Sequence, residues 1–279
     1  MAIAAGLAAI AIAILIVIMA REAQRTRVEE LTVELERLPA SWDGTVILFV
    51  SDLHRRIVPE TLVADIRSRY PVELVLIGGD MTERGVPLER TRANMERLRS
   101  LGPAYAVHGN HDYKTDYRRL DAVVQECGVK VLDNESVRFE KEGAELRLVG
   151  VDDPHTGRDQ LRLAFSETEP SSACTLLLAH DPAIMLRLGD EQADLVLAGH
   201  THGGQICVPG LGPLFTDAVY RRYSAGLYES DRMVNGSKYK TKLFVSRGFG
   251  TSRLPIRFQC PAEINLITLR SAKRPAPTR

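Results

Sequence analysis

Five short segments of this 279-residue sequence carry side chains that can bind metal ions, and each follows an apolar run. Their histidine, aspartate and asparagine residues offer nitrogen and oxygen donors to a divalent cation. Five of the seven histidines lie in these segments, beside glycines that allow close approach of the backbone to an ion. The segments are Asp52-Leu53-His54, Gly79-Asp80, Gly109-Asn110-His111-Asp112, His180-Asp181 and Gly199-His200-Thr201-His202.

The position of these segments at strand ends is what makes them a candidate site. Taken singly, a histidine or aspartate after a strand is more often a cap or turn residue than a metal ligand. In open α/β sheets, however, binding sites assemble at the carboxyl ends of the strands. The five segments together therefore predict one crevice in which residues far apart in the sequence converge.

The elements that must position these residues alternate along the chain. Apolar runs predict buried strands, and longer amphipathic stretches predict helices between them, which indicates an α/β core. The strands are expected at 46–50, 74–77, 104–107, 176–179 and 195–198, and the helices at 59–70, 87–101, 115–126 and 182–188. Closely spaced runs at 129–132, 137–140, 145–150 and 263–269 favour a mixed, layered sheet.

Residues 28–38 can be interpreted in two ways. Leu31, Val33 and Leu35 alternate with polar residues as in a half-buried strand, whereas Val28, Leu31, Leu35 and Leu38 would also form a helical seam. We favour the strand, because Pro39 and a turn at 41–44 then lead into the strand at 46–50.

In this order, the motifs Asp-x-His, Gly-Gly-Asp, Gly-Asn-His-Asp, a single histidine and Gly-His-x-His resemble the calcineurin-like metallophosphoesterase family, over about Val46 to Leu269. The chain is most similar to the bacterial membrane-associated branch, on three further segments. That branch includes hydrolases of UDP-2,3-diacylglucosamine and phosphoesterases of the cell envelope. The resemblance implies a layered α/β sandwich, with two mixed β-sheets flanked by helices. The three segments are 150–154, 198–205 and 246–250.

The resemblance also implies a metal-ligand set. Asp52, His54 and His202 would hold one ion, and Asp80 would bridge it to a second ion held by Asn110, His180 and His200. Such mixed nitrogen and oxygen donors suit manganese, iron or zinc better than calcium or magnesium. We expect two divalent ions, with manganese favoured. Two adjacent dications lower the pKa of a bridging water, so a metal-bridging hydroxide would attack phosphorus.

Further catalytic roles follow from the same resemblance. His111 is expected to be a general acid that protonates the leaving oxygen. Residues 79–85 resemble the Gly-Asp-x-x-Asp-Arg-Gly pattern of the protein-phosphatase branch, in which Glu83 would orient His111 and Arg84 would contact the phosphate. An exposed Glu83–Arg84 pair at the start of a helix is the alternative interpretation. His108 is expected to pack behind the ligands, and His155 to lie in a loop.

Candidate substrate-binding residues lie outside the metal motifs. Arg55 follows Asp52-Leu53-His54, where the family often has a small or apolar residue, and it favours a highly charged substrate unless it lies in a solvated turn. Arg253 and Arg257, in a C-terminal loop, are candidate phosphate contacts. Residues 208–241, rich in Gly, Tyr, Arg and Ser, are expected to lie over the crevice.

Residues 2–20 are uncharged and almost wholly aliphatic, which predicts a single transmembrane anchor. A cleaved signal peptide is the competing interpretation, but no basic residue precedes the apolar run and the cleavage site is poor. Arg21, Arg25 and Arg27 follow the anchor, so the positive-inside rule places the catalytic domain in the cytoplasm. The expected organisation is an anchor at 2–20, a basic juxtamembrane linker at 21–27, a metallophosphoesterase domain at 28–270 and a flexible tail at 271–279.

The charge balance narrows the substrate class. Lys plus Arg number 36 and Asp plus Glu number 36, so the chain has no global positive field and we expect no nucleic-acid partner. We expect hydrolysis of a phosphodiester, phosphomonoester or pyrophosphate bond, with a phosphorylated small molecule or a lipid-linked or nucleotide-lipid substrate. Alternatives are a broad-specificity phosphodiesterase, a protein phosphatase or a non-catalytic metal-binding scaffold. The sequence does not indicate an oligomeric state.

Overall fold

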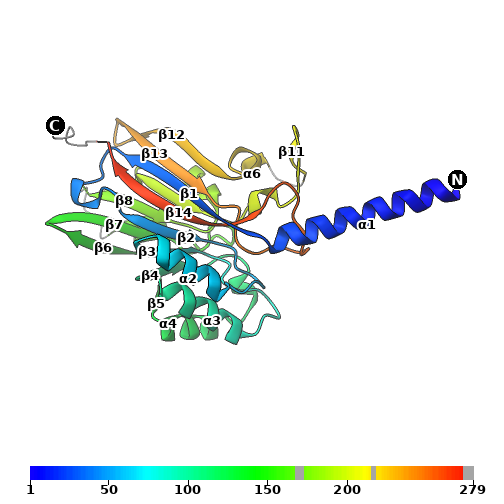
Figure 1. Ribbon diagram of the computed structural model, residues 1–279. Coiled ribbons are helices and arrows are strands. Elements are labelled where there is room, and N and C mark those ends of the chain that lie inside the picture. The colour runs from blue at the N-terminus through cyan, green and yellow to red at the C-terminus, as the bar shows by residue number, and fades with distance from the viewer. Residues whose placement is uncertain (167–172, 215–217, 273–279) are drawn as a thin grey trace, which may run out of the picture.

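Two six-stranded sheets pack face to face in the computed structural model, which describes residues 1–166, 173–214 and 218–272 (Figure 1). The core between the sheets is aliphatic and aromatic. Phe49 of the first sheet meets Phe244 of the second edge-on, with ring centroids 6.2 Å apart. This is the layered α/β sandwich that the sequence predicts.

The first sheet is mixed. β1 runs parallel to β14, β14 runs antiparallel to β2, and the remaining strands run parallel to β2. All five residues of β2 are buried because the sheet is covered on both faces: Ile47 and Phe49 face the second sheet, and Leu48 and Val50 face the helices. In spatial order the strands are β1 (Thr26–Leu35), β14 (Ala262–Ser271), β2 (Val46–Val50), β3 (Val72–Gly78), β4 (Ala104–Val107) and β5 (Val129–Val131).

The second sheet has parallel strands at its centre and antiparallel strands at both edges. Its order is β12 (Gly226–Val234), β13 (Ser237–Val245), β9 (Leu195–Ala198), β8 (Cys174–Leu178), β7 (Ala144–Gly150) and β6 (Glu135–Lys141). A separate two-stranded hairpin joins β10 (Cys207–Val208) to β11 (Gly212–Pro213).

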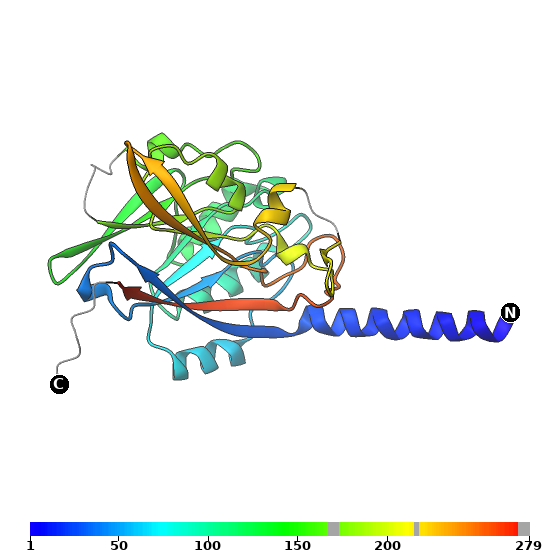
Figure 2. The same ribbon diagram turned by 90° about the horizontal axis from the view of Figure 1, so that it is seen from above.

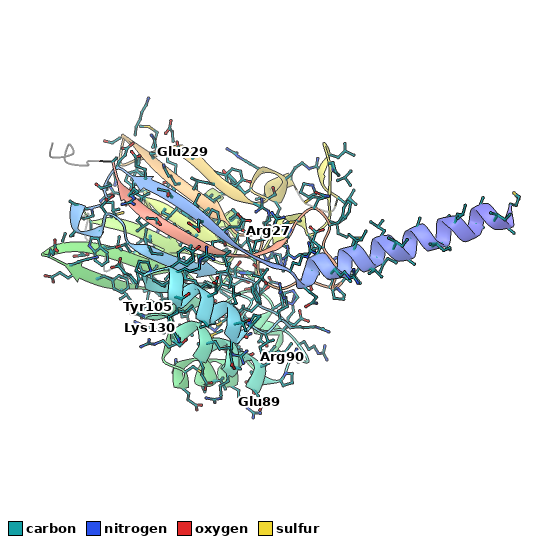
Figure 3. The ribbon with its side chains drawn as sticks, viewed as in Figure 1. Arg27, Glu89, Arg90, Tyr105, Lys130 and Glu229 are labelled. Carbon is teal, nitrogen blue, oxygen red and sulfur yellow. The ribbon has the colours of Figure 1, made fainter. Side chains whose placement is uncertain are left out.

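Three helices cover the outer face of the first sheet, and their apolar faces complete a second core cluster. They are α2 (Glu60–Arg69), α3 (Leu88–Arg99) and α4 (Tyr117–Glu126). Glu89 and Arg90 lie on the solvent side of α3 (Figure 3). Shorter turns pack on the second sheet or connect strands: α5 (Leu161–Ala164), α6 (Ala218–Arg222), and 3₁₀ helices η1 (Ala40–Trp42), η2 (Asp112–Lys114), η3 (Pro182–Leu186) and η4 (His202–Gly204).

The expected strands and the helices at 59–70, 87–101 and 115–126 are present, and residues 26–35 form a strand rather than a helix. Two expectations about the segments 182–188 and 208–241 are wrong. The expected helix at 182–188 is a short 3₁₀ helix. Residues 208–241 do not all lie over the crevice, because β12 and β13 extend the second sheet and pair over 226–245. The charged residues of β12 alternate with partly buried ones, which is typical of an edge strand with one face in solvent.

Helix α1 (Ala2–Gln24) extends away from the domain, and its aliphatic residues up to Ile18 are exposed (Figures 1 and 2). By length and composition it can cross a membrane. The helix continues past the expected end at Ala20, and β1 begins at Thr26, so residues 21–27 are not a separate linker. Ser271 belongs to β14, and residues 273–279 of the predicted tail lie outside the described residues.

Arg257 is not a substrate-binding residue, contrary to the sequence-based expectation. It is fully buried and does not line the crevice. Its guanidinium donates hydrogen bonds to backbone carbonyls of three segments, because a long loop without regular structure needs donors for its buried oxygens. The acceptors are the oxygens of His202 (3.3 Å), Arg247 (2.7 Å), Gly248 (3.2 Å), Gly250 (2.6 Å) and Cys260 (3.0 Å).

We predict that Arg257→Gln lowers the free energy of unfolding by about 3 kcal/mol or more, because several buried carbonyls lose their donor. Arg253 is exposed, so Arg253→Gln is the matched control and is expected to change stability by less than about 0.5 kcal/mol. Chemical denaturation of the full-length protein in detergent measures both values. Equal stability of the two variants would contradict the structural role of Arg257.

Candidate metal centre

All seven predicted metal ligands meet at one end of the two sheets. They sit at the carboxyl ends of β2, β3 and β4 in the first sheet and of β8 and β9 in the second, as expected for an α/β site. A crevice of about 900 Å³ opens over them. Its lining includes Asp80, Asn110, His111, His200 and His202.

The first ligand group consists of Asp52, His54 and His202. The Nε2 atoms of the two histidines lie 3.1 Å apart, and His202 Nε2 lies 3.3 Å from Asp52 Oδ1. All three side chains are buried. Two ligand atoms that each lie about 2.0–2.2 Å from one ion are separated by roughly 3 Å, so this spacing fits a shared ion.

The second group consists of Asn110, His180 and His200. The Nδ1 atom of His200 lies 3.2 Å from His180 Nε2 and 3.1 Å from Asn110 Oδ1. His180 Nδ1 lies 2.7 Å from the carbonyl oxygen of Gly78 and donates to it when it carries the proton, which leaves Nε2 free to bind a metal.

Asp80 joins the two groups. Its Oδ2 atom lies 3.5 Å from His54 Nε2 and 3.4 Å from His180 Nε2. Its Oδ1 atom accepts a hydrogen bond of 2.7 Å from the backbone N–H of His111. One carboxylate oxygen therefore faces both groups while the other is fixed by the next loop, as the bridging role expected from the sequence requires.

The chemistry of these side chains fits divalent cations. Asp52 Oδ1 is fully buried, yet it accepts no hydrogen bond from any residue that the structure describes. Burial lowers the pKa of His202 to about 3 and, together with the neighbouring His180, that of His200 to about 4. Both imidazoles are therefore neutral at pH 7, which is the state that binds a metal ion. Glu83 raises the pKa of His54 and Asp80 raises that of His180 against the effect of burial, so a metal ion would displace a proton from these two rings.

The backbone at the site is held in an unusual conformation. Five of the seven predicted ligands, namely Asp52, His54, Asp80, His200 and His202, have φ between 48° and 69°. This left-handed region is costly for residues with a side chain, and it persists at functional sites where the surrounding structure enforces it. Gly109 packs so closely on Asp80 that a Cβ atom there would collide with its carboxylate.

Glu83 contacts a metal ligand more closely than it contacts His111. Its Oε2 atom lies 3.2 Å from His54 Nδ1 but 4.0 Å from His111 Nδ1. Glu83 also pairs with Arg55. A carboxylate beside the outer nitrogen of a metal-binding histidine would fix its tautomer and ring orientation, and the geometry places Glu83 closer to His54 than to His111, the predicted general acid.

The predicted cationic contacts to substrate are mostly outside the crevice. Arg55 is paired with Glu83 and does not line the crevice, and Arg84 is exposed and does not line it either. Arg253 does line it. The ring of His111 also lines the crevice and meets His54 edge-on, with centroids 4.9 Å apart.

Sequence reasoning missed the position of His155 at the crevice and placed it only in a loop. Asp153 accepts the backbone N–H of His155 at 3.1 Å and folds that loop over the crevice, which His155 lines. Its ring centroid lies 4.8 Å from that of His200, and its Nδ1 lies 3.7 Å from Asp181. The signal was available, because the segment follows β7 as the other segments follow their strands. His108 packs against Asp121 behind the site, as expected.

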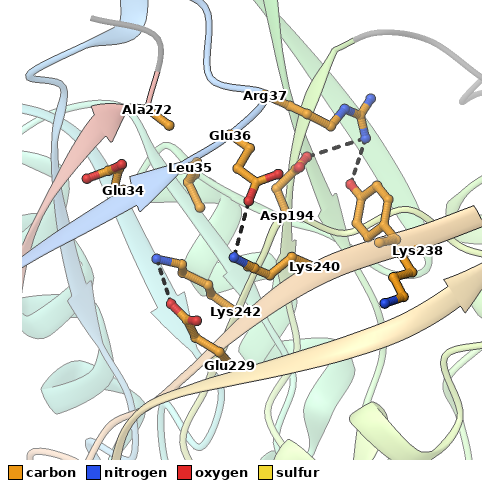
Figure 4. Close-up of a pocket in the computed structure, with 11 residues that line it drawn as sticks. Glu34, Leu35, Glu36, Arg37, Asp194, Glu229, Lys238, Lys240, Lys242 and Ala272 are labelled. Carbon is orange, nitrogen blue, oxygen red and sulfur yellow. Dashed lines mark hydrogen bonds and ion pairs between the residues drawn. The ribbon is translucent and has the colours of Figure 1, made fainter.

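A second hollow, of about 400 Å³, lies between β1 and β13 (Figure 4). It contains none of the predicted site residues, and much of its charge is internally paired. Lys240 lies 3.2 Å from Glu36, and Lys242 lies 3.0 Å from Glu229. The chemistry therefore belongs to the first crevice.

Comparison with known proteins agrees with this geometry. YpbG of Bacillus subtilis (strain 168), an uncharacterised protein, is 35% identical over 225 residues, covering 80% of each chain. Phosphodiesterase YaeI of Escherichia coli (strain K12) is 30% identical over 232 residues, covering 80% of this chain and 81% of YaeI. A Bos taurus transmembrane protein with a metallophosphoesterase domain is 32% identical over 273 residues, covering 90% of this chain and 58% of its own length.

Residues 45–204, which contain all seven predicted ligands, match the sequence profile of the calcineurin-like phosphoesterases. The matched span runs from the start of β2 to the end of η4 and thus covers the strand ends that build the site. On the sequence match, the relatives and the clustered ligands for divalent metals, this chain belongs to the calcineurin-like phosphoesterase family and is a metallophosphoesterase.

Proposed function

We propose that this protein is a two-metal phosphodiesterase, loaded with manganese and anchored in a membrane by α1. The observation that carries the proposal is the position of Asp80 Oδ2, within 3.5 Å of a histidine nitrogen from each ligand group. Asp52, His54 and His202 would hold one ion and Asn110, His180 and His200 the other. When bound, two such ions supply a strong Lewis acid for the phosphoryl oxygens and lower the pKa of coordinated water.

Other residues that line the crevice would contact the leaving group and the phosphate oxygens. His111 lines the crevice beside the shared carboxylate and would stabilise or protonate the leaving oxygen. Burial lowers the pKa of His111, so in the free protein its ring is neutral at pH 7. Lys114 and Arg253 line the same crevice and would contact phosphate oxygens. His155 would face the substrate from the opposite sheet.

Two observations favour a diester over a monoester. The crevice has a volume of about 900 Å³, which is large for a single phosphate group. The relative from Escherichia coli is named a phosphodiesterase. The same metals could also act on a phosphomonoester, a pyrophosphate or a phosphoprotein. The substrate assay below distinguishes a phosphomonoester from a phosphodiester.

Helix α1 supports a single-pass anchor rather than a removed signal segment. Met19 and Ala23 are buried against the domain, and the Met19 carbonyl accepts a hydrogen bond of 3.0 Å from the Arg257 N–H. Cleavage near Ala20 would break this contact. A relative is named a transmembrane protein. Arg21, Arg25 and Arg27 follow the helix and favour a cytoplasmic catalytic domain.

We predict that Asp80→Asn weakens binding of both ions by more than about tenfold, because the shared ligand loses its charge. His111→Ala is the matched control in the adjoining loop and should keep both ions. Inductively coupled plasma mass spectrometry after dialysis against manganese measures the ion content per chain. Equal metal loss in the two variants would contradict the proposal that Asp80 binds the ions and His111 acts only as the general acid.

Turnover is tested with full-length protein in detergent, stripped of metal and then reloaded with manganese. Bis-p-nitrophenyl phosphate should be cleaved faster than p-nitrophenyl phosphate, and Asp80→Asn should be inactive. His111→Ala should lower kcat by about two to four orders of magnitude, the usual size of a general-acid contribution. A metal-loaded protein that cleaves neither ester would instead favour a non-catalytic metal-binding scaffold.

A further inference from the structure

The metal centre lies at the end of the domain from which α1 leaves. β1 begins at Thr26, directly after α1, and β14 runs parallel to β1. β2 runs antiparallel to β14, with β3 and β4 parallel to β2. The strands that deliver Asp52, Asp80 and Asn110 therefore end where β1 begins, next to α1. Both views of the ribbon show this arrangement (Figures 1 and 2).

Helix α1 is joined to a wall of the crevice. The Arg257 N–H donates to the Met19 carbonyl at 3.0 Å, and the Cys260 N–H donates to Glu22 Oε1 at 2.9 Å. On the other side, Arg56 donates to the Gln24 carbonyl at 2.8 Å. The loop 250–260 is thus fixed to the last turns of the helix.

The same loop is braced to the β10–β11 hairpin. Ser252 N–H donates to Gln205 Oε1 at 2.9 Å, and Gln205 Nε2 donates to the Leu254 carbonyl at 3.0 Å. The Cys207 N–H donates to the Phe258 carbonyl at 2.8 Å. Loop 250–260 and residues 204–214 therefore form one connected rim, and several of its residues line the crevice.

The length of α1 determines where the rim lies relative to the membrane surface. At about 1.5 Å per residue, residues 2–20 span about 28 Å, close to the thickness of a bilayer's hydrocarbon core. The boundary between hydrocarbon and head groups then falls near Met19 and Ala20. This is where Arg257 contacts the helix, so an anchored domain holds its rim at the level of the lipid head groups.

The rim exposes large apolar side chains, which are unfavourable in contact with water. Leu211 is 81% exposed, Leu214 is 52% exposed and Leu254 is 58% exposed, and the last two line the crevice. Arg253, Arg21 and Arg25 are exposed on the same rim or the adjoining end of α1. Leucines that dip below the head groups, beside cations that pair with lipid phosphates, are typical of surfaces that rest on a membrane.

We propose that residues 204–214 and 250–260 form a membrane-facing rim that rests on the bilayer, and that the crevice takes the phosphate of a lipid held in the same leaflet. The proposal rests on the anchor and the phosphodiesterase activity proposed above. A lipid phosphate then reaches the metal centre along Leu214 and Leu254 with its chains still in the membrane.

Tryptophan fluorescence tests where the rim lies. The chain has one tryptophan, Trp42, which is buried and supplies a constant background. Leu211→Trp and Leu254→Trp place a probe on the rim, and Met233→Trp, at a side chain 61% exposed near the β12–β13 turn, is the matched control at the opposite end. The full-length variants are reconstituted in phosphatidylcholine–phosphatidylglycerol vesicles, with or without bromine on the lipid chains near the glycerol.

Quenching by brominated lipid should be severalfold stronger at positions 211 and 254 than at position 233. Equal, weak quenching at all three positions in protein that floats with the vesicles would overturn the rim and leave the anchor intact. A blue-shifted but unquenched probe at position 211 would also overturn it, since a second protein copy would then cover the leucines. Failure of the wild-type chain to float would overturn the anchor as well.

A second test separates substrate access from chemistry. Leu211 does not line the crevice. Leu211→Asp should therefore leave hydrolysis of soluble p-nitrophenyl ethyl phosphate unchanged while lowering hydrolysis of p-nitrophenyl hexadecyl phosphate in the same vesicles by about tenfold. Met233→Asp should affect neither. Equal rates of wild type and Leu211→Asp on the vesicle substrate would overturn lipid access through the rim. If the wild-type protein hydrolyses neither diester, the result would instead count against the proposed phosphodiesterase activity.

Discussion

The structure of the site depends on one carboxylate, that of Asp80. Its Oδ2 atom must face both ligand groups, while its Oδ1 atom accepts the His111 N–H. The first group draws on β2 and β9 and the second on β4, β8 and β9, so the carboxylate keeps its position only if the two sheets keep theirs. The interdigitated core between the sheets fixes that relation, because a close-packed interior does not deform gradually.

The same constraint explains why strain gathers at the strand ends. Five ligands adopt positive φ, each at a cost on the order of 1–3 kcal/mol. Such conformations persist because the loops around them are held from several sides. Asp112 accepts the N–H groups of Thr82 and Gly109, and Arg257 ties the loops after β9 and β13 together. Structural side chains behind the site are therefore as necessary to its geometry as the ligands.

Much of the site could be predicted from the sequence because its signals are local. Each ligand directly follows an apolar strand, so residue type and position suffice. Contacts across the fold leave no such signal. The residues next to Arg257 in the sequence do not reveal whether its guanidinium binds a phosphate or buried carbonyls. Likewise, the sequence does not reveal which of the two histidines His54 and His111 lies closer to Glu83. The β12–β13 pair was missed because the edge strand β12 and the first half of β13 alternate charged residues with less exposed ones and resemble a polar loop.

The position of α1 relative to the crevice could not be predicted from any segment alone. The sequence places an apolar helix before a strand, but strand order and direction decide at which end of the domain that strand begins. Because β1 is parallel to β14 and β14 is antiparallel to β2, the helix and the metal ligands share one end. If β1 ran in the opposite direction, the same anchor would hold the crevice away from the membrane. Sheet topology is therefore what relates the anchor to the chemistry in this fold.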